Sequence, residues 1–273
     1  MNKSIEIPPS LIYPVYKVAA EEINPGILTN SYNSHAIVVD TPGGKLKVND
    51  CSNEYQLIRN NAIIEPIVDG LIAAGHKVLV KGIAWNNAVF SIDIIVNRAL
   101  NEKVVVDKLY PSISTLNSYN GKIRCTSRLN IHRGFCENGL TIPVEGMARF
   151  LEFSHTPSNE EHIAVGKILS LFEEFLAQAG EIAEVYDDLK TSPVSNLEAR
   201  VDEVIDNTKF PAKFKEEVMD RANMEAARLA TRMTDWLVYN GFNFQLNHHE
   251  ELVWDPKKRM VADQEILSYL LNN

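Results

Sequence analysis

The fold is decided by Y-P-S-I-S-T-L-N-S-Y-N-G-K-I-R-C-T-S-R-L-N-I-H-R, residues Tyr110–Arg133. Asn120-Gly121 divides this stretch into two strand-like segments, and an Asn-Gly pair in such a place is the strongest local signal for a β-hairpin. From Lys122 onward the even positions are polar or basic, whereas the odd positions are small or apolar. Because successive side chains of a strand point to opposite faces, we expect one face to be buried and the other to present cations to solvent.

The polar face of this strand is the candidate binding surface. No acidic residue interrupts it, although the chain has a net charge of −9. Same-face residues lie ~6.6–7 Å apart, near the phosphate repeat of an extended nucleic-acid strand, and neighbouring aromatic rings can stack on bases. The alternative is an ordinary half-solvated strand, since exposed Lys, Arg, Thr and Asn need no function. The residues predicted to bind nucleic acid are Lys122, Arg124, Arg128, Asn130, His132, Arg133 and Tyr119.

Length and composition indicate a globular protein without a membrane segment. The 273 residues, 45% hydrophobic and 23% charged, suit one large or two modest domains. No apolar run approaches the ~18 residues of a membrane span, and the first residues lack the pattern of a signal peptide. The three cysteines have no C-x-x-C spacing and are expected to be reduced thiols of a cytoplasmic protein.

The order of predicted elements indicates an α+β fold. We expect an N-terminal arm over residues 1–30, an antiparallel sheet region with one packed helix over 31–144, and a helical region over 145–273 that packs with the sheet as one compact unit. Residues 1–145 hold 14 basic and 13 acidic residues, whereas 146–273 hold 13 and 23. The two halves are therefore expected to face different electrostatic partners.

Local patterns set the expected element bounds. Strands are predicted at 35–40, 45–50, 55–59, 76–85, 88–97, 110–119 and 122–133, with turns at Thr41–Gly44, Asn86-Asn87 and Asn120-Gly121. Helices are predicted at 60–74, 145–155, 159–187, 195–207, 212–239 and 263–271, with Gly75 and Gly241 each ending one of them.

No combination of residues points to catalysis. His248-His249-Glu250-Glu251 contains two possible metal ligands, but adjacent residues do not share a helix face and the H-E-x-x-H spacing is absent. Phosphate-binding glycine loops and the G-x-S-x-G motif are absent as well. We therefore predict no catalytic residue, no bound metal and no cofactor, and we lean against an enzyme.

The long predicted helices carry wide apolar stripes that include Phe172, Phe175, Met219 and Met233. One sheet face is not wide enough to cover both stripes. We therefore expect either that the helices pack on each other as well as on the sheet, or that they extend into a partner subunit, and we favour a homo-oligomer.

Three segments carry a family resemblance: C-S-N-E-Y-Q-L-I-R-N (Cys51–Asn60), N-S-Y-N-G (Asn117–Gly121) and R-G-F-C-E-N-G-L (Arg133–Leu140), with W-L-V-Y-N at Trp236–Asn240. In this order they resemble the phage- and plasmid-encoded domain-of-unknown-function family numbered nine-three-two. The matching positions are Tyr55, Asn60, Asn117, Gly121, Arg133, Cys136, Asn138 and Gly139. The chain departs from the family at Gly134-Phe135, where a branched residue is usual. The resemblance implies a phage or other mobile-element origin but no activity.

Three function classes follow from these patterns. The first is a phage-encoded protein that binds nucleic acid, single-stranded DNA above all, in replication or recombination in the cytoplasm of an infected bacterium. The second is a protein-binding phage factor that inhibits a host defence or replication complex through its acidic half. The third, a metal-dependent nuclease or nucleotide hydrolase, requires acids that converge from separate elements.

Overall fold

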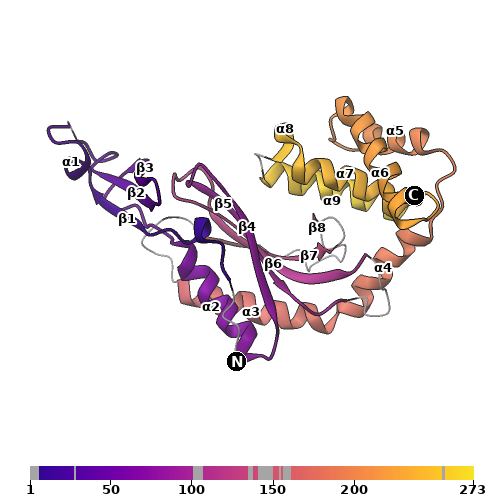
Figure 1. The fold of residues 1–273 in the computed structure, drawn as a ribbon, viewed down its shortest axis with the longest axis horizontal. Helices are drawn as coiled ribbons and strands as arrows, with labels where there is room; N and C mark the ends of the chain where they lie inside the picture. The colour runs from indigo at the N-terminus through magenta and orange to yellow at the C-terminus, as the bar shows by residue number, and fades with distance from the viewer. Residues whose placement is uncertain are drawn as a thin grey trace. The chain divides into compact units, whose positions relative to one another are not determined.

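The chain folds into two compact units, both of which combine strands and helices, so the α+β class is confirmed (Figure 1). The computed structural model describes residues 6–27, 29–100, 107–134, 138–140, 150–153, 155, 161–253 and 256–273. The first unit comprises Met1–Arg98, Ser112–Leu129 and Arg149–Glu174, and the second comprises Ala99–Pro111, Asn130–Ala148 and Phe175–Asn273. This division differs from the expected boundaries at residues 30 and 144.

A small antiparallel sheet in the first unit has the order β1 (Val15–Ala19), β2 (His35–Thr41) and β3 (Gly44–Cys51). The predicted strand, turn and strand over residues 35–50 are confirmed. The expected arm is more ordered than predicted, because β1, the short helix η1 (Pro9–Leu11) and helix α1 (Ala20–Ile23) lie within it.

The larger sheet has the order β4 (Val78–Trp85), β5 (Val89–Val96), β6 (Leu109–Ser118), β7 (Cys125–Arg133) and β8 (Asn138–Leu140), and β9 (Phe150–Phe153) also pairs with β7. Both predicted hairpins of this sheet are confirmed.

Left-handed backbone at the predicted turns explains why the hairpins form where they do. Asn86 and Asn87 have φ angles of 51° and 52°, as a two-residue hairpin turn requires. Gly121, at the second hairpin, has a φ of 68°. Asparagine and glycine adopt this conformation more readily than other residues.

One helix prediction and one strand prediction in this unit are wrong. Residues 150–153, expected within a helix, form β9, and 55–59 do not form a strand. The Gln56 N–H donates instead to the carbonyl oxygen of His155. Short apolar segments of this kind do not distinguish a strand from a helix.

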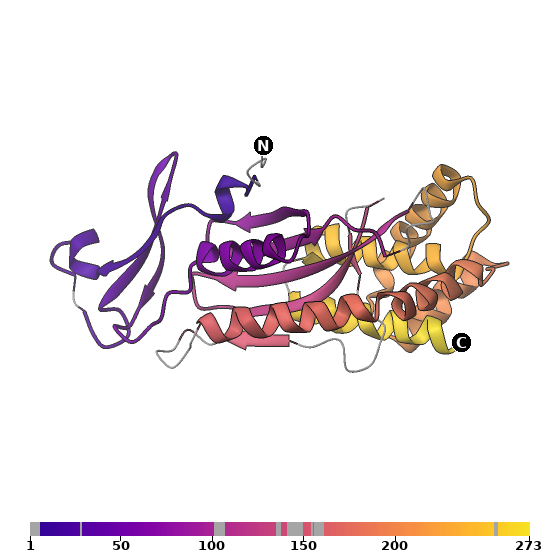
Figure 2. The same cartoon turned by 90° about the horizontal axis from the view of Figure 1, so that it is seen from below.

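Helices α2 (Asn60–Ala73) and α3 (Glu161–Ala177) lie side by side against the larger sheet in the first unit (Figure 2). A Cβ atom added to Gly70 of α2 would lie 2.5 Å from a methyl carbon of Leu169 on α3, so the glycine lets the two helices approach closely. Apolar side chains of both helices are buried: Ile63, Ile64, Ile67, Val68, Leu71, Ile168 and Phe172.

The second unit is mainly helical: α4 (Ala179–Thr191), α5 (Leu197–Asn207), η2 (Ala212–Phe214), α6 (Lys215–Leu229), α7 (Asp235–His248), α8 (Glu250–Val253) and α9 (Pro256–Asn272). Almost every residue of α7 is buried, so α7 forms the centre of this unit.

The two long predicted helices are each broken, which corrects the expected bounds. The first divides into α3 and α4 at Gln178, and α6 ends at Ala230 in the left-handed conformation, with a φ of 50°. Gly241 does not end a helix but lies inside α7, where an added Cβ atom would stand 2.6 Å from the carbonyl oxygen of Val218. The glycine therefore allows α6 and α7 to touch.

Much of the apolar surface of these helices is covered within the chain. Phe172 and Phe175 are buried, and Met219 and Met233 are half-buried. These stripes therefore supply little reason for self-association. In the part of the chain that the structure describes, no helix is both long enough and apolar enough to cross a membrane.

Candidate nucleic-acid interface

One face of the larger sheet in the first unit packs against helices. The Asn117 side chain, near the end of β6, donates to the side-chain oxygen of Asn60 at the start of α2, at 2.8 Å. A Cβ atom added to Gly82 of β4 would lie 2.9 Å from a methyl carbon of Leu11 in η1. Asn117 and Gly82 therefore point to the helix-covered side.

The opposite face of the sheet is the one we call the open face. Strand register places Lys81 of β4 opposite Asp93 of β5, and Ile83 opposite Ser91. Alternation assigns to this face the odd-numbered residues 79–85 of β4, the odd-numbered residues 89–95 of β5 and the even-numbered residues 112–118 of β6. Four of these residues are buried: Ile95, Ser112, Ser114 and Ser118. Leu79 is 47% exposed and Ile83 is 52% exposed, so apolar surface on this face reaches solvent.

The first part of β7 contributes cations to the open face. The Thr115 and Ser127 hydroxyl oxygens are 2.8 Å apart, which places both side chains on the helix-covered face. Alternation then puts Arg124, Thr126 and Arg128 on the open face. Arg124, directly before β7, is exposed and Arg128 is half-buried. Lys122, which precedes the strand, is exposed as well.

The prediction that the polar side chains of this strand face solvent is wrong beyond Arg128. Asn130 and His132 are buried although they continue the same alternation, and Ile131 between them is buried on the other face. The residues from Asn130 onward belong to the second unit. Both faces of the strand are covered there, so its exposed polar face ends where the first unit ends.

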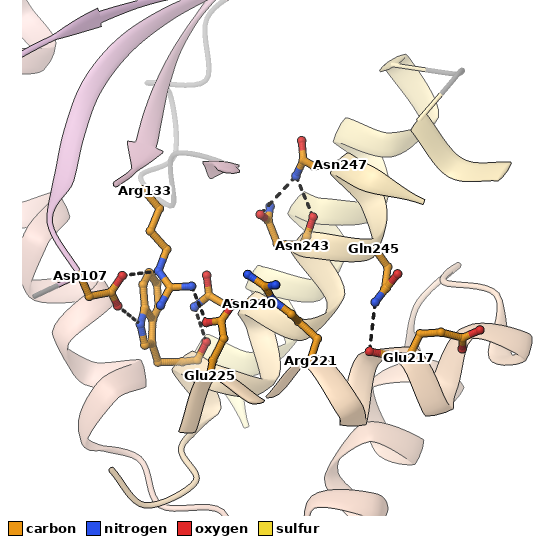
Figure 3. A network of polar contacts seen from close by, with 10 residues as sticks. Asp107, Arg133, Glu217, Arg221, Glu225, Asn240, Asn243, Gln245 and Asn247 are labelled. Carbon is orange, nitrogen blue, oxygen red and sulfur yellow. Dashed lines mark hydrogen bonds and ion pairs between the residues drawn. The ribbon is translucent and has the colours of Figure 1, made fainter. Parts of the chain in front are cut away.

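Arg133 is fully buried in a network of charges within the second unit (Figure 3). Its guanidinium binds the Glu225 carboxylate of α6 at 2.6 Å and also pairs with Asp107. Asp107 in turn accepts the indole N–H of Trp236 on α7 at 2.6 Å, and Arg221 pairs with Glu225 at 2.7 Å. Arg133 thus ties β7 to α6 and α7, and it is not a surface contact for nucleic acid.

Tyr119 is also buried, which excludes the predicted stacking on bases. Its ring lies 4.6 Å from the ring of Phe90, and its hydroxyl oxygen accepts the backbone N–H of Asn60 at 3.2 Å. Burial raises the pKa of Tyr119 to about 12. Its role is to pack the start of α2 on the sheet.

Four of the residues that carry the family resemblance come together around this tyrosine: Tyr55, Asn60, Asn117 and Gly121. The Asn117 amide donates to Asn60 and, at 2.9 Å, to the carbonyl oxygen of Ile58. The Tyr55 hydroxyl donates to the Ser118 carbonyl oxygen at 3.4 Å, and Gly121 lies against the Tyr55 ring. Gly121 takes the left-handed backbone of the predicted Asn-Gly turn, whereas the buried amide pair Asn117–Asn60 gave no local signal in the sequence.

The other resemblance positions do not join this group. Arg133 lies in the second unit, and Cys136 falls outside the residues that the structure describes. Asn138 and Gly139 form part of β8, where they pair with Arg133 and His132.

The histidines at the end of α7 diverge. The His248 ring lies 4.4 Å from the ring of Phe244, and the His249 ring lies 4.3 Å from that of Phe214. Glu251 forms an ion pair with Lys213. Among the described residues, no group of three or more His, Cys, Asp or Glu side chains is placed to hold a metal ion.

No protein-family model, curated protein or solved structure matches this chain. The open face, with apolar side chains on β4 and cations at β7, is therefore the feature of the molecule from which a function can be argued.

Proposed function

We propose that the chain is a nucleic-acid-binding protein of a phage or related mobile element, and that it holds single-stranded DNA on the open face during replication or recombination. The observation that supports this proposal is an antiparallel sheet with helices on one face and with exposed cations and apolar side chains on the other. Sheets with this layout suit single strands, because bases rest on the sheet while cations meet the phosphates.

The spacing of the groups favours an extended strand over a duplex. Arg124 and Arg128 are two same-face steps apart, or ~13–14 Å along the strand. Leu79 and Ile83 on β4 offer apolar surface to unstacked bases. A duplex hides the faces of its bases and would leave these side chains without a partner.

A salt titration tests the proposal. Binding of a fluorescent oligo-dT to the full chain is measured between about 50 and 200 mM salt, next to a duplex and an RNA of equal length. We expect the DNA single strand to bind tightest. The R124A/R128A variant should bind more weakly, with a log–log salt slope shallower by roughly 1.4, since each lost phosphate contact on a single strand accounts for ~0.7.

The matched control is R228A/R232A. These arginines of the second unit are also four residues apart and exposed, so the variant removes the same charge from a different surface. Its salt slope should equal that of the unmodified chain. Equal slopes for both variants, or tighter binding of the duplex than of the single strand, would contradict the proposal.

A protein-binding factor is the second candidate function. Residues 146–273 hold 13 basic and 23 acidic residues, and exposed carboxylates gather on α5 and α6: Glu203, Asp206, Glu216, Glu217 and Asp220. Such a surface suits a basic partner. Failure of the chain to bind any nucleic acid at the lowest salt would favour this candidate.

A further inference from the structure

The chain contains three Asn-Gly pairs: Asn120-Gly121, Asn138-Gly139 and Asn240-Gly241. In such a pair the glycine nitrogen can attack the side-chain carbonyl carbon of the asparagine, because glycine has no Cβ atom to obstruct the approach. The new C–N bond closes a succinimide ring, while the bond to the side-chain amide nitrogen breaks and that nitrogen leaves as ammonia with the proton from glycine. Water then opens the ring to aspartate or isoaspartate, so a neutral side chain becomes a carboxylate.

The fold protects two of these pairs by holding them in regular backbone. Asn240-Gly241 lies inside α7, where Asn240 is fully buried and its side-chain amide donates to the Trp236 carbonyl oxygen at 2.5 Å. Asn138-Gly139 lies in β8, which pairs with β7. Ring closure requires the asparagine backbone to rotate out of both the helical and the extended conformation, so hydrogen bonds of the helix or the sheet must break first.

Asn120-Gly121, by contrast, lies between β6 and β7, and Gly121 is exposed with a φ of 68°. The side-chain oxygen of Asn120 accepts the backbone N–H of Lys122 at 3.1 Å. This hydrogen bond folds the carboxamide of Asn120 back over the backbone of Gly121. It also draws electrons from the side-chain carbonyl carbon and stabilises the oxyanion that forms when a nitrogen attacks. The turn therefore favours the first step of the reaction.

The attacking nitrogen has a polar group beside it. Burial raises the pKa of Tyr55, and the Gly121 N–H near its hydroxyl oxygen offsets part of this rise. The Tyr55 ring also lies 3.6 Å from the position that a Cβ atom on Gly121 would take. An oxygen next to the N–H increases the electron density on the nitrogen and receives the proton that the nitrogen must release.

We propose that Asn120-Gly121 is a site of spontaneous deamidation in the folded protein, and that the carboxylate formed there weakens the binding of single-stranded DNA to the open face. The new charge stands close in sequence to Lys122 and Arg124, which are both exposed. It repels phosphates and so opposes these cations. The modification itself requires only water, whereas its effect on binding rests on the proposed function.

Peptide mapping by mass spectrometry tests the modification in the folded full chain, incubated for several days at mildly alkaline pH. We expect Asn120 to deamidate at least about tenfold faster than Asn138 or Asn240, because the turn holds its side-chain carbonyl near the attacking nitrogen. The control is the same chain in concentrated urea, where the three pairs should react at similar rates. An Asn120 that reacts no faster than Asn240 in the folded chain would overturn the proposal, and so would an equal advantage of Asn120 in urea.

Binding of a fluorescent oligo-dT tests the consequence. Asn120→Asp reproduces one product and should weaken binding about two- to fivefold at about 50 mM salt, by a factor that shrinks as salt rises. Asn207→Asp adds the same charge at an exposed residue of the second unit and should leave binding unchanged. Equal affinities for Asn120→Asp and the unmodified chain would overturn the effect on binding. A chain that binds no oligonucleotide would refute the proposed function together with this effect, whereas the deamidation itself is decided by the peptide maps.

Discussion

Replacing Arg133 with Ala should destabilise the protein by about 3–5 kcal/mol, the usual cost of breaking a buried ion pair from one side. Arg133 and Glu225 are both fully buried. The loss of stability is limited because both carboxylates retain a second partner in the variant. Glu225 still forms its ion pair with Arg221 at 2.7 Å, and Asp107 still accepts the indole N–H of Trp236 at 2.6 Å. We therefore expect a value near the lower end of this range, about 3 kcal/mol.

Urea unfolding followed by circular dichroism measures this effect, with Arg124→Ala as the control. Arg124 lies nine residues earlier in the same hairpin arm and is exposed, so its replacement should change the free energy of unfolding by less than about 0.5 kcal/mol. A cost below about 1 kcal/mol for Arg133→Ala, typical of a surface pair, would refute the structural role assigned to Arg133. An equal cost for the two variants would refute it as well.

Three further predictions concern stability. Gly241→Ala should lower the free energy of unfolding by about 1–3 kcal/mol, because the new methyl group meets the α6 backbone. Gly166→Ala on α3, where the methyl group meets open space, should raise it by roughly 0.5–1 kcal/mol. The thermal midpoint should therefore fall for the first variant and rise for the second. Asn117→Ala should cost about 1–3 kcal/mol in urea unfolding, because it removes the donor to two buried oxygens. Burial lowers the pKa of His155 below 6.5, so the folded protein takes up this proton at lower pH than the unfolded chain, and stability should fall as pH drops below 6.5. His155→Gln should flatten this part of the stability profile, and an unchanged profile would remove His155 as its cause.

Local signals predicted the hairpins but not the ends of the long helices. Asn86-Asn87 and Asn120-Gly121 set their turns through the backbone conformation that these residues favour. The breaks at Gln178 and Ala230 occur at residues that do not stop a helix by themselves. Tertiary packing sets these breaks, and a pattern read over one helix does not contain that information.

The burial of the second half of β7 was not predictable for the same reason. Alternation correctly indicated which face each residue occupies, but it does not report what covers that face. Two of the residues that contact Arg133, Glu225 and Trp236, lie about a hundred residues further along the chain. A sequence pattern alone predicts that a basic residue of a strand is exposed, because it does not show which distant carboxylates will pair with that residue in the fold.

Photo-crosslinking most directly tests whether single-stranded DNA lies on the open face. An oligo-dT that carries 4-thiothymidine is irradiated with the full chain at about 50 mM salt, and the crosslinked peptides are identified by mass spectrometry. We predict crosslinks within residues 78–96 and 112–128, which form this face. Crosslinks confined to residues 175–273, or none under conditions where the oligonucleotide binds, would contradict the account.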